Sequence, residues 1–142
     1  MRKKYKSKVA KKIKTYCQVN YDKVSKSKMR MGNGLFNHRC QLNTVQMVKE
    51  GLMKSVYLCI CTNDEDYPIV HFINLSNDNK FIDNTLGFDY ESYDYYIIRK
   101  IDESEFNKMN DLLMDTKKML IMQHSRTLMN KIFRVDEYNL GI

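Results

Sequence analysis

Three residues with side chains suited to acyl transfer occur along the chain in the order Cys40, His71 and Asp83. A cysteine attacks a carbonyl carbon only as the thiolate, and a helix N-terminus or a neighbouring imidazolium stabilises that anion. An imidazole moves the proton, and a carboxylate fixes the orientation and tautomer of the imidazole. The pattern predicts Cys40 as nucleophile, His71 as general base and acid, and Asp83 as the residue that orients His71.

The segments around these residues predict elements that bring them together. Cys40 opens CQLNTVQMVKE, which is typical of a helix, and Gly51 is suited to end it. His71 lies in the apolar stretch PIVHFINL, which predicts a strand over residues 68–75. Asp83 ends a short strand over residues 80–83, after a polar turn. Adjacent antiparallel strands joined in this way can place His71 and Asp83 on the same face.

The rest of the body indicates the fold class. Residues 56–62 and 95–101 have the composition of buried strands, and residues 105–134 predict one long C-terminal helix. Consecutive short antiparallel strands between helices are typical of an α+β domain rather than of repeated βαβ units.

The stretch HFINLSNDNKFIDNTLG, residues 71–87, resembles the transglutaminase-like branch of the papain-like cysteine enzymes. In that family a histidine begins an apolar strand, a turn with Asp, Asn or Gly follows, and the next strand ends in Asp-x-Thr, often with a glycine soon after. Asp83, Thr85 and Gly87 match this pattern. The resemblance implies that a helix bearing Cys40 packs on a small antiparallel sheet. It also implies a thiol-dependent hydrolase or acyltransferase that acts on an amide or peptide bond through a thioester on Cys40.

Such an enzyme needs hydrogen-bond donors for the oxyanion of its tetrahedral intermediate. The backbone N–H of Cys40 is the natural first donor. The side-chain amides of Asn37 and Gln41 are both candidates for the second, and Asn37 is preferred because it precedes the thiol by about one turn. Hydrolysis and transfer to an amine use the same three residues, so the sequence leaves both open; the expected substrate is a protein or peptide.

An alternative interpretation is a metal site whose ligands come from the pairs His38-x-Cys40 and Cys59-x-Cys61. Zinc sites usually space each ligand pair by two to four residues in tight turns, whereas Cys59 and Cys61 lie in a continuous apolar strand. We therefore expect no metal. Residues 32–34 are too short for a glycine-rich phosphate loop, so we expect no cofactor.

Charge divides the chain unevenly. Residues 1–30 contain 12 of the 24 Lys and Arg residues but one of the 17 acidic residues, which leaves residues 31–142 mildly acidic. We expect two parts, a basic N-terminal arm over residues 1–30 and a single α+β domain over residues 31–142. Val9, Ile13 and Cys17 recur at helical spacing, so part of the arm is predicted to be helical. Residues 25–34 are expected to be a flexible connector.

The basic arm supports an alternative function, a non-catalytic protein that binds nucleic acid or another polyanion through residues 1–30. The other interpretation of the arm is a solubilising tail, or a helix that packs its narrow apolar face on the body. The sequence leaves these interpretations open.

The sequence also predicts a location. It has no apolar run of the roughly 20 residues that a membrane span needs, and no signal peptide is recognisable. We therefore expect a cytoplasmic protein with no membrane partner and with four free thiols. Its abundance of Lys, Asn, Ile and Tyr indicates an AT-rich coding source such as a bacteriophage or a low-GC bacterium. The oligomeric state is not indicated.

Overall fold

The structure is a computed structural model that describes residues 1–64, 68–125 and 127–133. The elements, in chain order, are α1 (Arg2–Asn20), β1 (Asp22–Lys23), η1 (Lys26–Lys28), β2 (Met29–Arg30), α2 (Cys40–Lys49), β3 (Ser55–Thr62), β4 (Ile69–Leu75), β5 (Phe81–Ile82), η2 (Gly87–Ser92), β6 (Asp94–Ile101), η3 (Glu103–Lys108), α3 (Met109–His124) and α4 (Thr127–Phe133).

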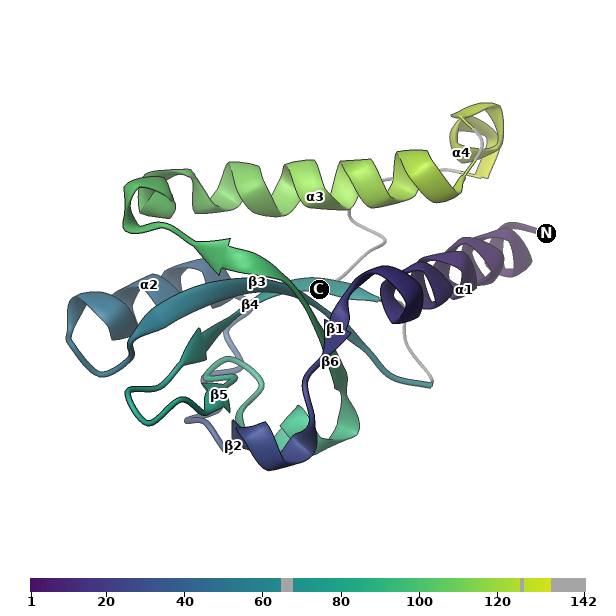
Figure 1. The fold of residues 1–142 in the computed structure, drawn as a ribbon. Coiled ribbons are helices and arrows are strands. Elements are labelled where there is room, and N and C mark those ends of the chain that lie inside the picture. Colours follow the sequence, from purple (N-terminus) through teal and green to yellow (C-terminus); the bar gives the residue numbers. More distant parts are fainter. Residues whose placement is uncertain (65–67, 126, 134–142) are drawn as a thin grey trace.

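The described strands form one curled sheet in the order β1-β6-β3-β4-β5-β2 (Figure 1). The long strands β3, β4 and β6 pair antiparallel, and β2 pairs parallel with β5. β5 pairs with β4 only at Asn74 and Leu75. The outer edge of β4 before Asn74 is therefore not covered by β5, and α2 packs there.

Two hydrophobic clusters fill the two faces of the sheet. One cluster joins the inner sides of α1, α2 and α3 to alternate residues of β3 and β4, including Leu58, Ile60 and Phe72. The other contains Cys59, Cys61, Ile69, Ile73 and Tyr95, with Val24 and Met29 from the N-terminal segment. Figure 1 shows α3 crossing one side of the sheet, with η1 and β2 on the opposite side. The period-2 alternation of a strand explains why neighbouring residues enter different clusters.

The α+β class and the main elements agree with the sequence analysis. α2 begins at Cys40, and β3, β4, β5 and β6 coincide with the four predicted strands to within one or two residues. The single helix predicted over residues 105–134 is wrong. The 3-10 helix η3 precedes α3, α3 ends at His124, and Ser125 has an extended backbone (φ −139°, ψ 168°). Residue 126 and residues 134–142 lie outside the described residues.

The N-terminal 30 residues share the core with the rest of the chain. α1 buries Val9, Ile13 and Cys17 against the sheet, in the cluster that also contains Cys40. β1 pairs with β6 at one edge of the sheet, and β2 pairs with β5 at the other. The segment expected as a connector, residues 25–34, contains η1 and β2. Two-residue strands carry no periodic pattern, which is why the sequence did not indicate them.

None of the helices in the described part of the chain is both long and apolar enough to cross a membrane.

Candidate active site

Cys40 is the first residue of α2, at the edge of β4 that β5 leaves uncovered. The chain reaches this position through a tight loop in which Phe36 and His38 have positive φ angles of 47° and 55°. The Asn37 side chain accepts a hydrogen bond from the Arg39 backbone N–H at 3.1 Å, which fixes the entrance to the helix. The first N–H groups of a helix lack partners within it, so the thiol sits at a positive helix end.

His71 lies in the middle of β4, opposite Cys59 on β3. Its ring is buried, and Nε2 is 2.8 Å from Oδ2 of Asp83. Because Nε2 is bonded to Asp83, Nδ1 is the ring nitrogen on the side away from the carboxylate. The structure thus brings together the histidine and the aspartate that the sequence analysis selected from different strands.

Four hydrogen bonds hold the Asp83 carboxylate. Oδ1 accepts from the backbone N–H groups of Thr85 and Leu86, both at 3.0 Å. Oδ2 accepts from His71 and from the hydroxyl of Tyr95, both at 2.8 Å. A carboxylate offers about four lone-pair positions, so all are filled. Asp83 is consequently fixed from three directions: its own turn, β4 and β6.

Close backbone contacts hold the Asp83 turn against the N-terminal loop. A Cβ built on Gly87 would lie 2.3 Å from the Cα of Gly34, and one on Gly32 would lie 2.4 Å from the carbonyl oxygen of Asp83. Gly87 also has a φ of +60° and donates its N–H to that same oxygen at 2.9 Å. Only glycine fits where these backbone segments come so close together, so the contacts help to determine the position of Asp83.

A network of amide side chains, most of them buried, joins α2 to the same turn. Asn43 donates to Thr85 Oγ1 at 2.9 Å, and its amide pairs reciprocally with that of Asn37. From β4, Asn74 donates to the carbonyl oxygens of Thr44 and Ser55. These bonds fix the helix that carries Cys40 relative to the strand that carries His71.

The Cys40 thiol lies against His71, and its pKa is lowered. Burial alone would raise it, but the charge of His71, a side-chain hydrogen bond with that ring and a backbone hydrogen bond from Phe72 outweigh the desolvation. The Phe72 contact is available because β5 does not cover this part of β4. Cys40 also lies 3.7 Å from Gln41 Oε1, toward which the thiol donates. The contacts with His71 and Phe72 favour the thiolate, whereas the contact with Gln41 Oε1 forms only while the thiol is protonated.

The pKa values of His71 and Asp83 shift in the directions expected of a charged pair. Burial would lower the pKa of His71, yet the charges of Asp83 and Cys40 hold it well above its usual range. Burial would raise the pKa of Asp83, yet the charge of His71 and the hydrogen bonds to the carboxylate hold it below its usual range. The arrangement favours an imidazolium between a thiolate and a carboxylate.

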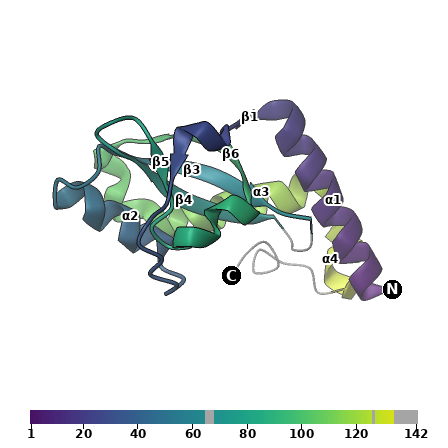
Figure 2. The same ribbon diagram turned by 90° about the horizontal axis from the view of Figure 1, so that it is seen from below.

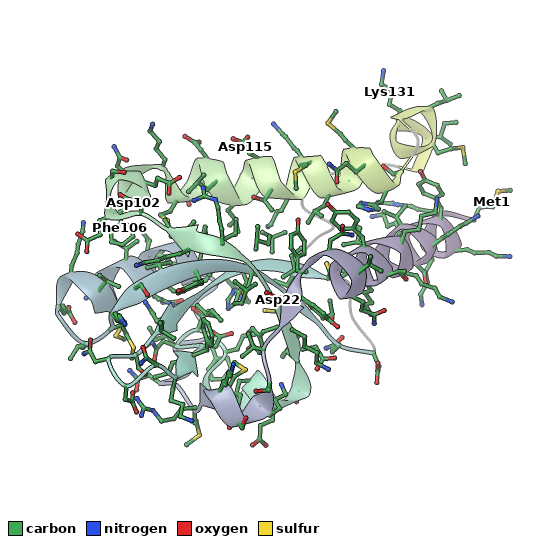
Figure 3. All side chains as sticks on the ribbon, in the orientation of Figure 1. Met1, Asp22, Asp102, Phe106, Asp115 and Lys131 are labelled. Carbon is green, nitrogen blue, oxygen red and sulfur yellow. The ribbon has the colours of Figure 1, made fainter. Side chains whose placement is uncertain are left out.

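A pocket of about 310 Å³ opens beside Cys40 and His71. Its other walls come from the loop before α2, from β4, from the Asp83 turn and from α3, and they consist of His38, Gln41, Ile69, Val70, Thr85, Leu86, Asn110, Leu113, Met114 and Lys117. The α3 residues follow i, i+3, i+4 and i+7 spacing, so one face of that helix forms a wall. Asp115, on the outer face, points away from the sheet (Figure 3).

The two oxyanion candidates have different positions. Gln41 lines the pocket next to the thiol, whereas Asn37 is not among the described residues that line it. The Asn37 amide is instead engaged with Asn43. The preference for Asn37, which rested on sequence distance alone, is therefore not favoured by this geometry.

Sequence reasoning missed several residues of the site. His38, Asn110 and Lys117 line the pocket, and Tyr95 holds Asp83. The α3 residues have the spacing of any core-facing stripe, so the sequence contained no signal that separated them from ordinary packing. A lysine as buried as Lys117 (5% exposed) is unusual, but its burial is not visible in the sequence.

One group in the described residues places potential metal ligands together: Cys61, His71 and Asp83, with ligand atoms within 4.8 Å of one another. This group differs from the set of ligands that the sequence spacing offered, which was His38, Cys40, Cys59 and Cys61. A metal on Asp83 Oδ2 would have to break the bond to His71, because the carboxylate is already saturated. Burial also holds the pKa of Cys61 well above its usual range, which disfavours the thiolate that a metal binds. The geometry fits a hydrogen-bonded pair better than a metal site.

Comparison of the chain with family models, with curated proteins and with solved structures finds no match.

Proposed function

We propose that this protein is a thiol-dependent hydrolase or acyltransferase, of the transglutaminase-like or papain-like kind, that acts on an amide or peptide bond. One observation carries the proposal. A cysteine at a helix N-terminus lies against a buried histidine whose other ring nitrogen is 2.8 Å from a fully bonded carboxylate, beside a pocket.

Each group has a defined part in the proposed acylation step. The Cys40 thiolate attacks the carbonyl carbon, a C–S bond forms, and the carbonyl electrons move to oxygen. When the tetrahedral intermediate collapses, the C–N bond breaks and the His71 imidazolium gives its proton to the leaving amine. Asp83 keeps the ring oriented throughout.

The second step releases the acyl group from the thioester. His71, now neutral, takes a proton from water or from an acceptor amine as that molecule attacks the thioester carbon. The C–S bond breaks, and the thiolate–imidazolium pair returns. Water as acceptor gives hydrolysis and an amine gives transfer, and the same residues serve both outcomes.

The oxyanion is held by the backbone N–H of Cys40 and by the side chain of Gln41. Gln41 Oε1 lies 3.7 Å from the sulfur as acceptor when Cys40 is a protonated thiol. Once the thiol has lost its proton, that contact loses its donor. Rotation of the amide about its last torsion then presents Nε2 to the pocket.

The proposal is tested with p-nitrophenyl acetate, a small activated ester that fits many thiol enzymes. We expect a burst of p-nitrophenolate and a mass gain of one acetyl group on the peptide containing Cys40. Cys40→Ala abolishes both signals. Cys17→Ala, which alters a buried thiol of α1, keeps them. Acetylation spread over several cysteines, or a burst that survives Cys40→Ala, contradicts the proposal.

A second function is favoured by the exposed face of α1. This face presents six basic side chains and no acidic one: Arg2, Lys3, Lys4, Lys8, Lys11 and Lys12. The buried side of the helix fixes them in place, and α1 and α2 lie at opposite ends of the sheet in both views (Figures 1 and 2). A row of basic side chains on a packed helix suits the phosphates of a nucleic acid.

Binding of a fluorescent DNA duplex at several salt concentrations tests this second function. Lys4→Glu, Lys8→Glu and Lys11→Glu together are expected to remove binding and its steep salt dependence. The matched control reverses exposed lysines elsewhere, at Lys49, Lys108 and Lys118. Equal losses in the two triple variants would show that overall charge, and not α1, attracts the DNA.

A further inference from the structure

The Asp83 carboxylate accepts one hydrogen bond from Tyr95, a residue that lies outside both the Asp83 turn and β4. Tyr95 lies on β6, which is separated from β4 by β3 in the sheet. Its ring is fully buried in the second hydrophobic cluster, and its hydroxyl reaches Asp83 Oδ2 at 2.8 Å. The same oxygen accepts from His71 Nε2 at 2.8 Å. Two donors thus share one carboxylate oxygen.

The phenol of Tyr95 is a permanent donor. Its pKa is held far above the usual range, first by burial and then by neighbouring acidic groups, among them the Asp83 carboxylate to which it is bonded. It therefore stays protonated wherever the protein is folded. A buried tyrosine hydroxyl needs a hydrogen-bond partner, and here the partner is the carboxylate that orients the histidine.

We infer that Tyr95 is a positioning residue of the proposed acyl-transfer site: its hydroxyl holds Asp83 Oδ2 in line with His71 Nε2 and withdraws negative charge from that oxygen. This inference rests on the proposed function. It assigns a role in the site to a strand that contributes no residue to the pocket.

The shared oxygen tunes the acidity of the histidine. A carboxylate that also accepts from a phenol is a weaker acceptor toward the imidazole, so the imidazolium gives up its proton more readily. That proton is the one needed by the leaving amine. Without the phenol, the carboxylate would bind the imidazolium more tightly and would lose one of the four hydrogen bonds that hold it, and both effects slow acyl transfer.

Several other titratable side chains surround the His71–Asp83 pair and must be kept constant in any test. They are Cys40 from α2, Cys59 and Cys61 from β3, and His38 and Lys117 across the pocket, while Lys26 lies 5.6 Å from the centroid of the Tyr95 ring. Replacing Tyr95 by Phe changes none of them and removes only the hydroxyl.

The experiment compares Tyr95→Phe with Tyr96→Phe. Tyr96 is the next residue of β6, is also buried and belongs to the opposite cluster. We expect Tyr95→Phe to slow acetylation of Cys40 by p-nitrophenyl acetate about tenfold, the loss of one hydrogen bond to a charged group. We also expect the pH at which the His71 imidazolium titrates, followed by ¹⁵N NMR, to move upward. Tyr96→Phe should change neither.

A fluorinated tyrosine incorporated at position 95 extends the test in case Tyr95→Phe does not fold. Its phenol is a stronger donor, so the titration of His71 is expected to move to lower pH. A slower reaction with an unmoved titration, or equal behaviour of Tyr95→Phe and Tyr96→Phe, would overturn the positioning role. Wild-type protein in which Cys40 is not acetylated at all would instead contradict the proposed function itself.

Discussion

The His71 ring separates two environments, and each contains a buried cysteine. On the pocket side, the pKa of Cys40 is lowered despite burial, because the thiol meets His71, a backbone N–H and a helix N-terminus. On the interior side, the pKa of Cys61 is held well above its usual range by burial, and Cys59 and Asp83 raise it further. Both thiols are buried, so the chemical type of the nearest groups, not burial, distinguishes a proposed nucleophile from a core residue.

The largest expected effect comes from removing the charge of Asp83. This carboxylate is bonded to one side of the His71 ring and so makes the two sides different. Asp83→Asn keeps the shape of the side chain but alters the tautomer that His71 adopts. We expect acetylation of Cys40 by p-nitrophenyl acetate to slow by about ten-thousandfold, as in a triad whose carboxylate is replaced by an amide.

The matched control for that variant is Asp78→Asn. Asp78 lies in the turn between β4 and β5, is exposed, and pairs with Arg30 at 2.7 Å. Its loss should leave the rate of Cys40 acetylation unchanged. Equal rates in the two variants would mean that Asp83 does not act on His71.

An intermediate effect is expected from a backbone contact on the Asp83 side of the ring. Gly87 and Gly51 both have positive φ, +60° and +75°, but a Cβ at Gly87 would collide with Gly34 whereas one at Gly51 would meet nothing within 4 Å. We expect Gly51→Ala to lower the free energy of unfolding by about 1 kcal/mol, and Gly87→Ala to lower it by about 3 kcal/mol.

The same two variants distinguish a loss of stability from a change in the position of Asp83. In urea unfolding both variants are destabilised, but only Gly87→Ala should also slow acetylation of Cys40, because the collision of its Cβ with Gly34 displaces the turn in which residue 87 bonds the carbonyl oxygen of Asp83. An equal free-energy loss in the two variants would show that the turn moves to accept the methyl group and does not fix Asp83.

The smallest effect is expected from Cys61. Cys61→Ala removes a buried sulfur from the interior side of His71 and leaves a small cavity, at a cost of about 1 kcal/mol measured by thermal unfolding. Acetylation of Cys40 should persist at nearly the wild-type rate. A strong loss of acetylation without a loss of fold would mean that Cys61, and not only Cys40, takes part in the chemistry.

The sequence predicted the elements that carry a strong local pattern. The helix beginning at Cys40 and the strands around His71 and Asp83 have clear periodicity and turn residues, and the structure forms them at those positions. The α+β class followed from their order. The meeting of His71 with Asp83 was predictable because one short turn joins their two strands.

What the sequence did not indicate depends on contacts between distant segments. Tyr95 reaches Asp83 only because β6 and β4 flank the same strand, and the α3 wall of the pocket depends on how that helix crosses the sheet. The two-residue strands β1 and β2 are defined by their partners and not by their own residues. The helix break at Ser125 was missed because the periodic apolar spacing continues past it.

The central claim is that His71 activates Cys40, and graded-pH labelling with iodoacetamide tests it most directly. Peptide mass mapping would report the rate at each cysteine for wild type, for His71→Ala and for the control His124→Ala. We predict that Cys40 is labelled well below pH 8, ahead of Cys17, whose pKa burial raises to about 12. His71→Ala should move labelling of Cys40 to higher pH, since burial then acts without the imidazolium, and His124→Ala should not. Labelling of Cys40 that is no faster than that of the other cysteines, or that is indifferent to the loss of His71, would contradict the claim.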